Sequence, residues 1–261
     1  MREMTPIEKY YNKFNEDKRL TRRHGNVEFV TSMKYISEYM EAEDKNSVID
    51  IGAGTGRYSI ALAESGYDVT AVELVKYNLG ILRSKKSSVK AFQGNAMNLK
   101  RFENDSFDAA LLFGPMYHLN KFEDRVKCLS EAKRVVKDNG IIFVAYCMNE
   151  YSIIKYGFME NHILSCIESN KISKDFKCIS DDNELYTYLR LEDIDELNRA
   201  ADIERIKIIS ADGPANYMRR ELNAMDEKTY SAFIEYHLST CERPELIGAA
   251  AHTVDILRNH K

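Results

Sequence analysis

Short runs of apolar residues alternate with amphipathic, helix-like stretches through the first half of the chain. The apolar runs, each short enough for a buried strand, cover residues 48–51, 68–72, 89–92, 109–113 and 141–147. Helical stretches lie between several of them, over residues 57–65, 76–86 and 121–137. Regular alternation of strand and helix predicts an α/β fold, in which a mainly parallel sheet carries helices on both faces.

Two helices are expected before the first strand, over residues 7–17 and 26–42. In the second helix, apolar residues from Val30 to Met40 recur at helical spacing and form one stripe. The segment His24-Gly25-Asn26 is expected to separate the two helices, with Asn26 as the N-cap of the second.

After the fifth predicted strand, apolar runs and helical stretches alternate less regularly. The expected helices there cover 150–170, 191–200, 214–225 and 227–240, and the extended pieces cover 185–190, 203–209 and 253–257. Asp138-Asn139-Gly140 is expected to form the turn into the fifth strand. With four prolines in 261 residues and no Gly/Ser-rich linker, the chain is predicted to form a single domain.

The first predicted strand runs directly into three glycines. The segment Asp50-Ile51-Gly52-Ala53-Gly54-Thr55-Gly56 has the spacing G-x-G-x-G, and a helical pattern resumes at Tyr58. A strand, a tight glycine loop and a helix form the opening unit of nucleotide-binding α/β sheets. Arg57 stands where the dinucleotide fingerprint G-x-G-x-x-G would place its third glycine. This difference favours S-adenosylmethionine over NAD as the ligand.

Polar residues follow the next strands at the same edge of the predicted sheet. Glu73 ends the second strand about 20 positions after the glycine loop, where an acidic side chain can accept hydrogen bonds from both hydroxyls of a ribose. Asn95 follows the third strand and could bind an adenine edge, or simply form an Asn/Gly turn with Gly94.

The fourth strand leads into Phe113-Gly114-Pro115-Met116-Tyr117-His118. Together with the motifs before it, this segment makes the chain resemble the class I S-adenosylmethionine-dependent methyltransferases, of the bacterial small-molecule type. The resemblance covers about residues 48–146 and implies a Rossmann-like, seven-stranded sheet whose last strand, near 251–258, is antiparallel to the fifth. The cofactor-binding residues that it implies are Asp50, Gly52, Ala53, Gly54, Gly56, Glu73, Leu74, Asn95, Ala96, Phe113 and Gly114.

The same resemblance divides the single domain into three parts. Residues 1–46 are expected to form an N-terminal helical lid, 47–148 the cofactor-binding core, and 149–261 the rest of the sheet with helical insertions over the acceptor pocket. Gly114 offers no side-chain acceptor for the exocyclic amine of a nucleic-acid base, which argues against a DNA adenine methyltransferase.

Net charge, cysteine content and the length of apolar runs limit the binding partners and the cellular location that we expect. A net charge of −4 disfavours an obligate nucleic-acid binder, although Lys18 to His24 form a local basic cluster. Five scattered cysteines without a C-x-x-C pair predict reduced thiols and no metal site. We find no signal-peptide pattern and no apolar run long enough to span a membrane, so we expect a cytoplasmic protein. No sequence feature sets the oligomeric state.

Methyl transfer from a sulfonium needs mainly alignment of the nucleophile, the methyl group and the sulfur, and a general base only when the nucleophile arrives protonated. The candidate catalytic residues are His118, Tyr117 and Tyr11. Other side chains considered for the pocket are His24, Tyr10, Arg19, Arg22, Arg23, Tyr236 and His237.

The sequence therefore predicts transfer of a methyl group from S-adenosylmethionine to an O, N or S atom of a small molecule. An RNA or protein methyltransferase remains open. So do a nicotinamide oxidoreductase, whose glycine motif should run one residue longer, and a non-catalytic adenosine-binding module.

Overall fold

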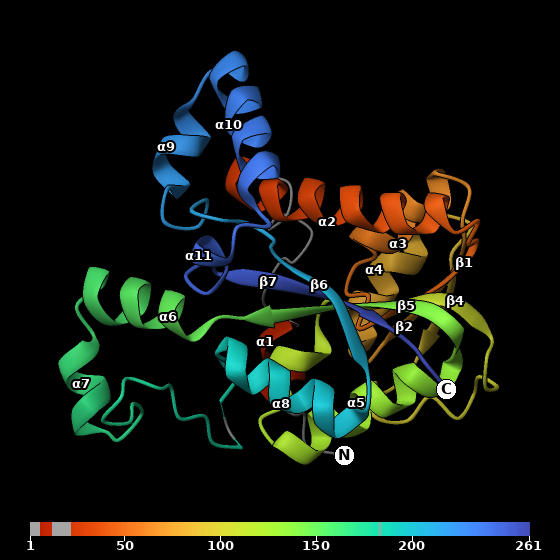
Figure 1. Ribbon diagram of the computed structural model, residues 1–261, viewed down its shortest axis with the longest axis horizontal. Helices are drawn as coiled ribbons and strands as arrows, with labels where there is room; N and C mark the ends of the chain where they lie inside the picture. The colour runs from red at the N-terminus through yellow and green to blue at the C-terminus, as the bar shows by residue number, and fades with distance from the viewer. Residues whose placement is uncertain (1–5, 12–21, 183) are drawn as a thin grey trace.

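The computed structural model describes residues 6–11, 22–182 and 184–261, and its centre is a seven-stranded sheet of order β3-β2-β1-β4-β5-β7-β6 (Figure 1). The strands are β1 (Ser47–Ile51), β2 (Asp68–Glu73), β3 (Lys90–Gln93), β4 (Phe107–Leu112), β5 (Val136–Cys147), β6 (Glu204–Ser210) and β7 (His252–Arg258). Only β7 runs antiparallel to its neighbours, β5 and β6. The predicted strand order along the chain and the antiparallel last strand are confirmed.

Helices cover both faces of the sheet. They are α1 (Pro6–Tyr11), α2 (Arg23–Ala42), α3 (Arg57–Glu64), α4 (Lys76–Ser84), α5 (Phe122–Val135), α6 (Asn149–Ser152), α7 (Ile163–Glu168), α8 (Leu191–Ala201), α9 (Arg219–Ala224), α10 (Glu227–Thr240) and α11 (Pro244–Ile247). A 3₁₀ turn, η2 (Pro115–Tyr117), follows β4, and a π-helical segment, η3 (Ile153–Met159), follows α6. Within the described residues, no helix is long and apolar enough to cross a membrane.

The alternating side chains of the strands bury apolar groups on both faces, as expected for a parallel sheet. On β1, Val48 packs into the core beneath α2 and α3, whereas Ile49 and Ile51 pack into the core beneath α5 and α8. Figure 1 shows these two helical layers, and shows α9 and α10 projecting beyond the end of α2. Because α2 contributes the buried Tyr35 and Ile36 to the core, it is a structural helix of the domain rather than part of a lid.

Several element boundaries differ from the predicted ones. Helix α2 begins at Arg23, so His24-Gly25-Asn26 is not a break and Asn26 is not an N-cap. Tertiary packing explains the difference, because Gly25 is buried and the Asn26 amide donates to the hydroxyl of Tyr230 on α10. Of the helix expected over 7–17, residues 12–17 lie outside the described part of the chain.

The helix expected over 150–170 is divided into α6, η3 and α7. Asn161, in the left-handed conformation at φ 60°, turns the chain between η3 and α7, and Ile163 packs against Gly157. The helix expected over 214–225 is reduced to α9, because the Asn216 amide donates to the Asp212 carboxylate in the preceding loop. The extended piece at 185–190 makes a single bridge, between Met148 and Leu189.

The turn expected at 138–140 lies inside a longer strand, since β5 already begins at Val136. Asn139 takes a left-handed φ of 59°, and the β4–β5 register shifts between Phe107 and Ala109. The turn is therefore an irregularity within β5 that separates its short first part from the buried run at 141–147.

Candidate active site

The glycine loop between β1 and α3 takes a backbone shape that side chains would obstruct. Gly52, Gly54 and Gly56 all have positive φ values of 84°, 55° and 87°. A Cβ atom on Gly52 would lie 2.6 Å from Pro115 Cδ, because the loop after β4 passes directly over the loop after β1. The two loops thus form one continuous floor at the carboxyl edge of the sheet.

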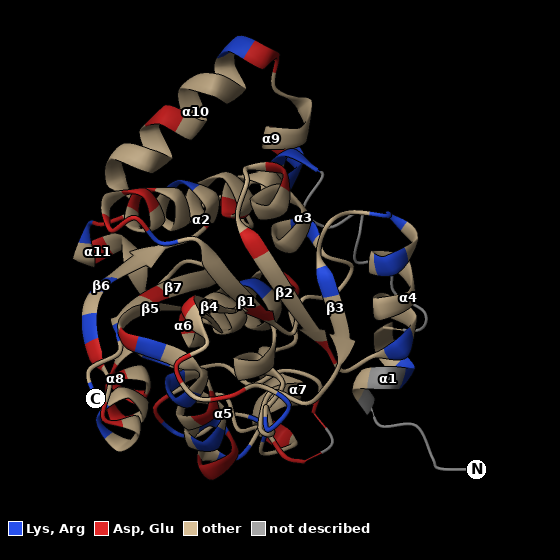
Figure 2. Ribbon diagram, turned by 90° about the vertical axis from the view of Figure 1, so that its right-hand side faces the viewer, with Lys and Arg blue, Asp and Glu red and all other residues tan. Residues whose placement is uncertain are grey.

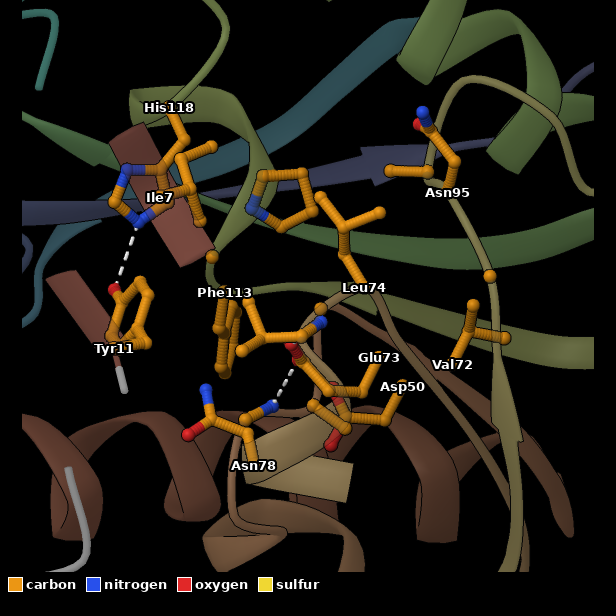
Figure 3. A pocket seen from close by; sticks show the side chains of 18 of the residues that line it. Ile7, Tyr11, Asp50, Val72, Glu73, Leu74, Asn78, Asn95, Phe113 and His118 are labelled. Carbon is orange, nitrogen blue, oxygen red and sulfur yellow. Dashed lines mark hydrogen bonds between the residues drawn. The ribbon is translucent and has the colours of Figure 1, made fainter. Parts of the chain in front are cut away.

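Glu73, the last residue of β2, holds this loop from the side. Its Oε2 accepts a hydrogen bond from the backbone N of Gly54 at 2.8 Å, and its Oε1 accepts one from the backbone N of Val75 at 2.7 Å. Figure 3 shows the Glu73 side chain in the cavity. The side chain is only 5% exposed. The carboxylate is therefore fixed beside the glycine loop by two main-chain donors before any ligand is considered.

A second carboxyl group lies in the floor of the site. Asp50 on β1 is buried and accepts a hydrogen bond from Ser59 Oγ at 2.5 Å. Burial raises the pKa of Asp50 to about 7, against the lowering effect of Ser59 and with a further increase from the Glu73 charge. A positive charge entering this site would stabilise the ionised form of Asp50.

One cavity brings together the residues that the sequence singled out (Figure 3). Ten of the eleven predicted cofactor-binding residues and all three predicted catalytic residues line it: Asp50, Gly52, Ala53, Gly54, Glu73, Leu74, Asn95, Ala96, Phe113, Gly114, Tyr11, Tyr117 and His118. Gly56 does not. It is the N-cap of α3, where a Cβ would lie 2.2 Å from Leu82 Cδ1, so its position is explained by helix packing.

Two asparagines at the cavity differ in what their side chains already bind. Asn95 is exposed, and its Oδ1 accepts a hydrogen bond from the backbone N of Met97, so it also forms the local turn that the sequence allowed. Asn78 on α4 is buried, and its Oδ1 accepts no hydrogen bond from the described residues. Sequence analysis missed Asn78, because a polar residue in a helix carries no signal that it faces a cavity.

His118 is held by both ring nitrogens. Nδ1 donates to the carbonyl oxygen of Leu185 at 2.7 Å, so Nε2 carries the lone pair and accepts the hydroxyl proton of Tyr11, 2.8 Å away. Burial lowers the pKa of His118 to about 4. His118 is therefore a neutral, fully hydrogen-bonded group. Tyr117 donates its hydroxyl proton to the carbonyl oxygen of Phe113 at 2.6 Å.

The remaining side chains considered for the pocket lie elsewhere or outside the described residues. Arg23 and His24 interact with residues 223–227, Arg22 is exposed, and Tyr236 and His237 line a different cavity near α10 and α11. Tyr10 packs edge-on against Tyr11 and Tyr186. Lys18 and Arg19 are not among the described residues.

Comparison with known proteins agrees with this geometry. Residues 49–144 match the model of the methyltransferase domain family. The chain is 33% identical over 103 residues to a glycine/sarcosine N-methyltransferase of Parasynechococcus marenigrum, covering 38% of this chain and 36% of that one. It is 29% identical over 112 residues to a demethylmenaquinone methyltransferase of Paenarthrobacter aurescens, covering 43% of this chain and 43% of that one. The matches thus span less than half of these curated relatives.

Among solved structures, a S-adenosylmethionine-dependent methyltransferase of Thermotoga maritima, described as a possible histamine N-methyltransferase, aligns with a TM-score of 0.56 at 18% identity. The alignment covers 97% of this chain and 99% of that one, which establishes the fold. The chain therefore contains a methyltransferase domain over residues 49–144, on the fold of the S-adenosylmethionine-dependent methyltransferases.

The cavity suits the cofactor of this family. Its donor and acceptor set is chemically matched: the Glu73 carboxylate for ribose hydroxyls, the buried Asp50 carboxyl for a cationic group, and the open Oδ1 of Asn78 for a ligand N–H or O–H. When bound, S-adenosylmethionine supplies an activated methyl group on a sulfonium.

Proposed function

We propose that the protein transfers a methyl group from S-adenosylmethionine to an O, N or S atom of a small-molecule acceptor. The observation that carries this proposal is the Glu73 carboxylate, fixed by Gly54 and Val75 beside the glycine loop in one cavity with Asp50. In this proposal the backbone of the loop after β1 holds the methionine part of the cofactor, Glu73 binds the ribose, and Leu74, Asn95 and Ala96 surround the adenine.

Side chains from α3 and from η2 and its neighbours form part of the cavity wall. The ring of Tyr58 packs against Phe113 with centroids 4.8 Å apart, and Tyr117 packs against His118 at the same separation. Such a wall excludes water and fixes the direction from which an acceptor approaches. Alignment is the main requirement for displacement at a methyl group, because the sulfonium is already a good leaving group.

The position of helix α1 favours a small-molecule acceptor over a macromolecular one. Ile7 and Tyr11 line the same cavity as Asn78 on α4, so α1 covers the cofactor site from outside. A covered cavity suits a small molecule better than a polynucleotide or a folded protein. In the view of Figure 2, acidic and basic residues are interleaved along α5, whereas the charged residues coloured along α4 are basic.

The named relatives act on chemically different small molecules, by their descriptions glycine or sarcosine and demethylmenaquinone, which supports the class of acceptor without selecting one. The direct test is a methyl-incorporation assay with labelled S-adenosylmethionine. We expect transfer to members of a panel of small amines, thiols and phenols, and none to bulk tRNA, rRNA or DNA. Salt-sensitive methylation of RNA, with no transfer to any small molecule, would overturn the acceptor class.

A further inference from the structure

Three titratable side chains meet outside the cofactor cavity, and sequence analysis considered none of them. They are Glu28 on α2, Asp212 in the loop after β6, and His252, the first residue of β7. The Nδ1 atom of His252 lies 2.7 Å from Asp212 Oδ2 and 3.6 Å from Glu28 Oε2.

Asp212 is the fixed member of this group. It is fully buried, its Oδ1 accepts from the backbone N atoms of Ala251 and His252 at 3.1 Å each, and its Oδ2 accepts from Asn216 Nδ2 at 2.7 Å. Because a carboxylate only accepts, the His252 contact places the proton on Nδ1. Nε2, on the other side of the ring, makes no hydrogen bond to any residue described here.

This pair lies beside the cofactor cavity. His252 pairs with Cys147, the last residue of β5, and therefore lies at the carboxyl edge of the sheet. The ring centroid of His252 is 6.5 Å from that of Tyr117, which lines the cavity. The His252 side chain is 19% exposed and that of Asp212 is 0% exposed, so the imidazole is the accessible end of the pair.

His252 differs from His118 in the hydrogen bonding of its ring nitrogens. In His118 the lone pair of Nε2 is already used by the Tyr11 hydroxyl, and burial holds its pKa at about 4. In His252 the buried Asp212 carboxylate holds the proton on Nδ1, so Nε2 carries the lone pair once the ring is deprotonated. A buried aspartate that orients an imidazole in this way is the arrangement by which proteins build a general base.

We propose that His252, oriented by Asp212, is the general base of the methyl transfer, and that the acceptor is an amine that arrives as its ammonium ion. The proposal rests on the proposed function. His252 Nε2 takes a proton from the ammonium nitrogen, leaving a neutral amine and an imidazolium. The nitrogen lone pair then forms the new C–N bond as the C–S bond breaks, and the bonding electrons of C–S stay on sulfur, giving a thioether and a methylated ammonium. His252 returns its proton to water.

The surroundings of His252 adjust its strength as a base. Burial lowers its pKa, but Glu28, Cys147 and Asp212 together raise the pKa well above its usual value. Tyr117 and Tyr151 face the same ring from η2 and α6. A stronger base is better matched to an alkylammonium proton. Because the working form is the deprotonated one, kcat/KM should rise with pH through the pKa of His252.

The test compares His252→Gln with the wild type on two kinds of amine, using labelled S-adenosylmethionine. At a pH above the pKa of His252 but below that of an alkylamine, where the substrate is still protonated, we expect kcat/KM for the alkylamine to fall about 100-fold or more. For an aniline, which is neutral at that pH, we expect a change of less than about threefold, and the alkylamine loss should shrink as the pH rises. His260→Gln, at an exposed histidine paired with Glu204, is the matched control and should behave as wild type. An equal effect on both kinds of amine, or no effect, would contradict the proposal.

A second readout does not depend on turnover. The pKa of the His252 ring, followed by NMR and assigned from the signal missing in His252→Gln, should lie above the usual histidine value and fall in Glu28→Gln. A ring whose pKa is unchanged in Glu28→Gln would contradict the arrangement of charges described here. Failure of the proposed function would look different, because the wild type would then not bind S-adenosylhomocysteine. A wild type that binds it and methylates only phenols or thiols would overturn the amine assignment.

Discussion

At the scale of single residues, the site depends on side chains whose environment decides what they can do. Asp50 and Glu73 are both carboxyl groups at strand ends in one cavity, but burial raises the pKa of Asp50 to about 7, whereas Glu73 accepts two backbone N–H groups. Likewise His118 is bonded at both nitrogens and His252 at one. Residue type alone therefore does not distinguish a binding group from a base.

Replacing Glu73 by Ala removes the acceptor for the ribose and the anchor of Gly54 and Val75. We expect the affinity for S-adenosylhomocysteine to fall by about 2–3 kcal/mol, because charge-assisted hydrogen bonds are lost in a buried site. Titration calorimetry measures this directly. Asp68→Ala is a matched control on the same strand, where the exposed carboxylate pairs with Lys90, and it should bind as wild type. Unchanged affinity in Glu73→Ala would exclude the ribose assignment.

Gly52→Ala tests the packing of the two loops at the carboxyl edge. The new Cβ would lie 2.6 Å from Pro115 Cδ at a φ of 84°, so we expect a loss of about 2 kcal/mol or more in the free energy of unfolding. Gly80→Ala is the matched control, because a Cβ there meets nothing within 4 Å on helix α4, and it should stabilise by about 0.4–1 kcal/mol. Urea unfolding of both variants measures the difference. Equal effects would show that the loops do not pack as described.

At the scale of elements, the N-terminal segment divides into two parts with different roles. Helix α2 is part of the core through Tyr35, Ile36 and Met40, whereas α1 places Ile7 and Tyr11 at the cofactor cavity. The lid predicted for residues 1–46 therefore remains a prediction for the part before α2. Of that part, the described helix α1 contributes no residue to either of the two large apolar cores.

Deleting residues 1–21 should weaken binding of S-adenosylhomocysteine by about tenfold or more, because the cavity loses Ile7 and Tyr11 as a wall. The deletion leaves Arg23 and its contacts to Met225 and Glu227 intact. Circular dichroism should therefore show an unchanged α/β core. Full cofactor affinity in the truncated protein would refute the lid.

The elements that sequence predicted well are those whose pattern is local. Short apolar runs in the sequence mark the strands at 47–51 and 107–112, and helical stripes mark the helices between strands. The observed strands and helices lie close to these predicted positions. The helices of segment 149–182 were predicted less accurately. The sequence pattern there indicates one helix, but a turn at Asn161 and the packing of Ile163 on Gly157 divide it. Tertiary contacts likewise extended α2 through Gly25.

At the scale of the whole molecule, the sheet brings distant segments to one edge. Glycine spacing and strand-end position predicted residues that do line one cavity, because each of these signals lies within a short stretch of sequence. The His252–Asp212–Glu28 group joins residues from β7, the loop after β6 and α2, and no local pattern relates them. Sequence could therefore predict most residues of this cavity but not the group of side chains beside it.

The central claim is that this cavity binds S-adenosylmethionine and not a nicotinamide dinucleotide. Calorimetric titration of the wild-type protein with S-adenosylhomocysteine and, separately, with NADH tests it most directly. We predict saturable binding of one S-adenosylhomocysteine per chain, lost or strongly weakened in Glu73→Ala, and no measurable heat of binding with NADH. Saturable binding of NADH, with none of S-adenosylhomocysteine, would contradict the account.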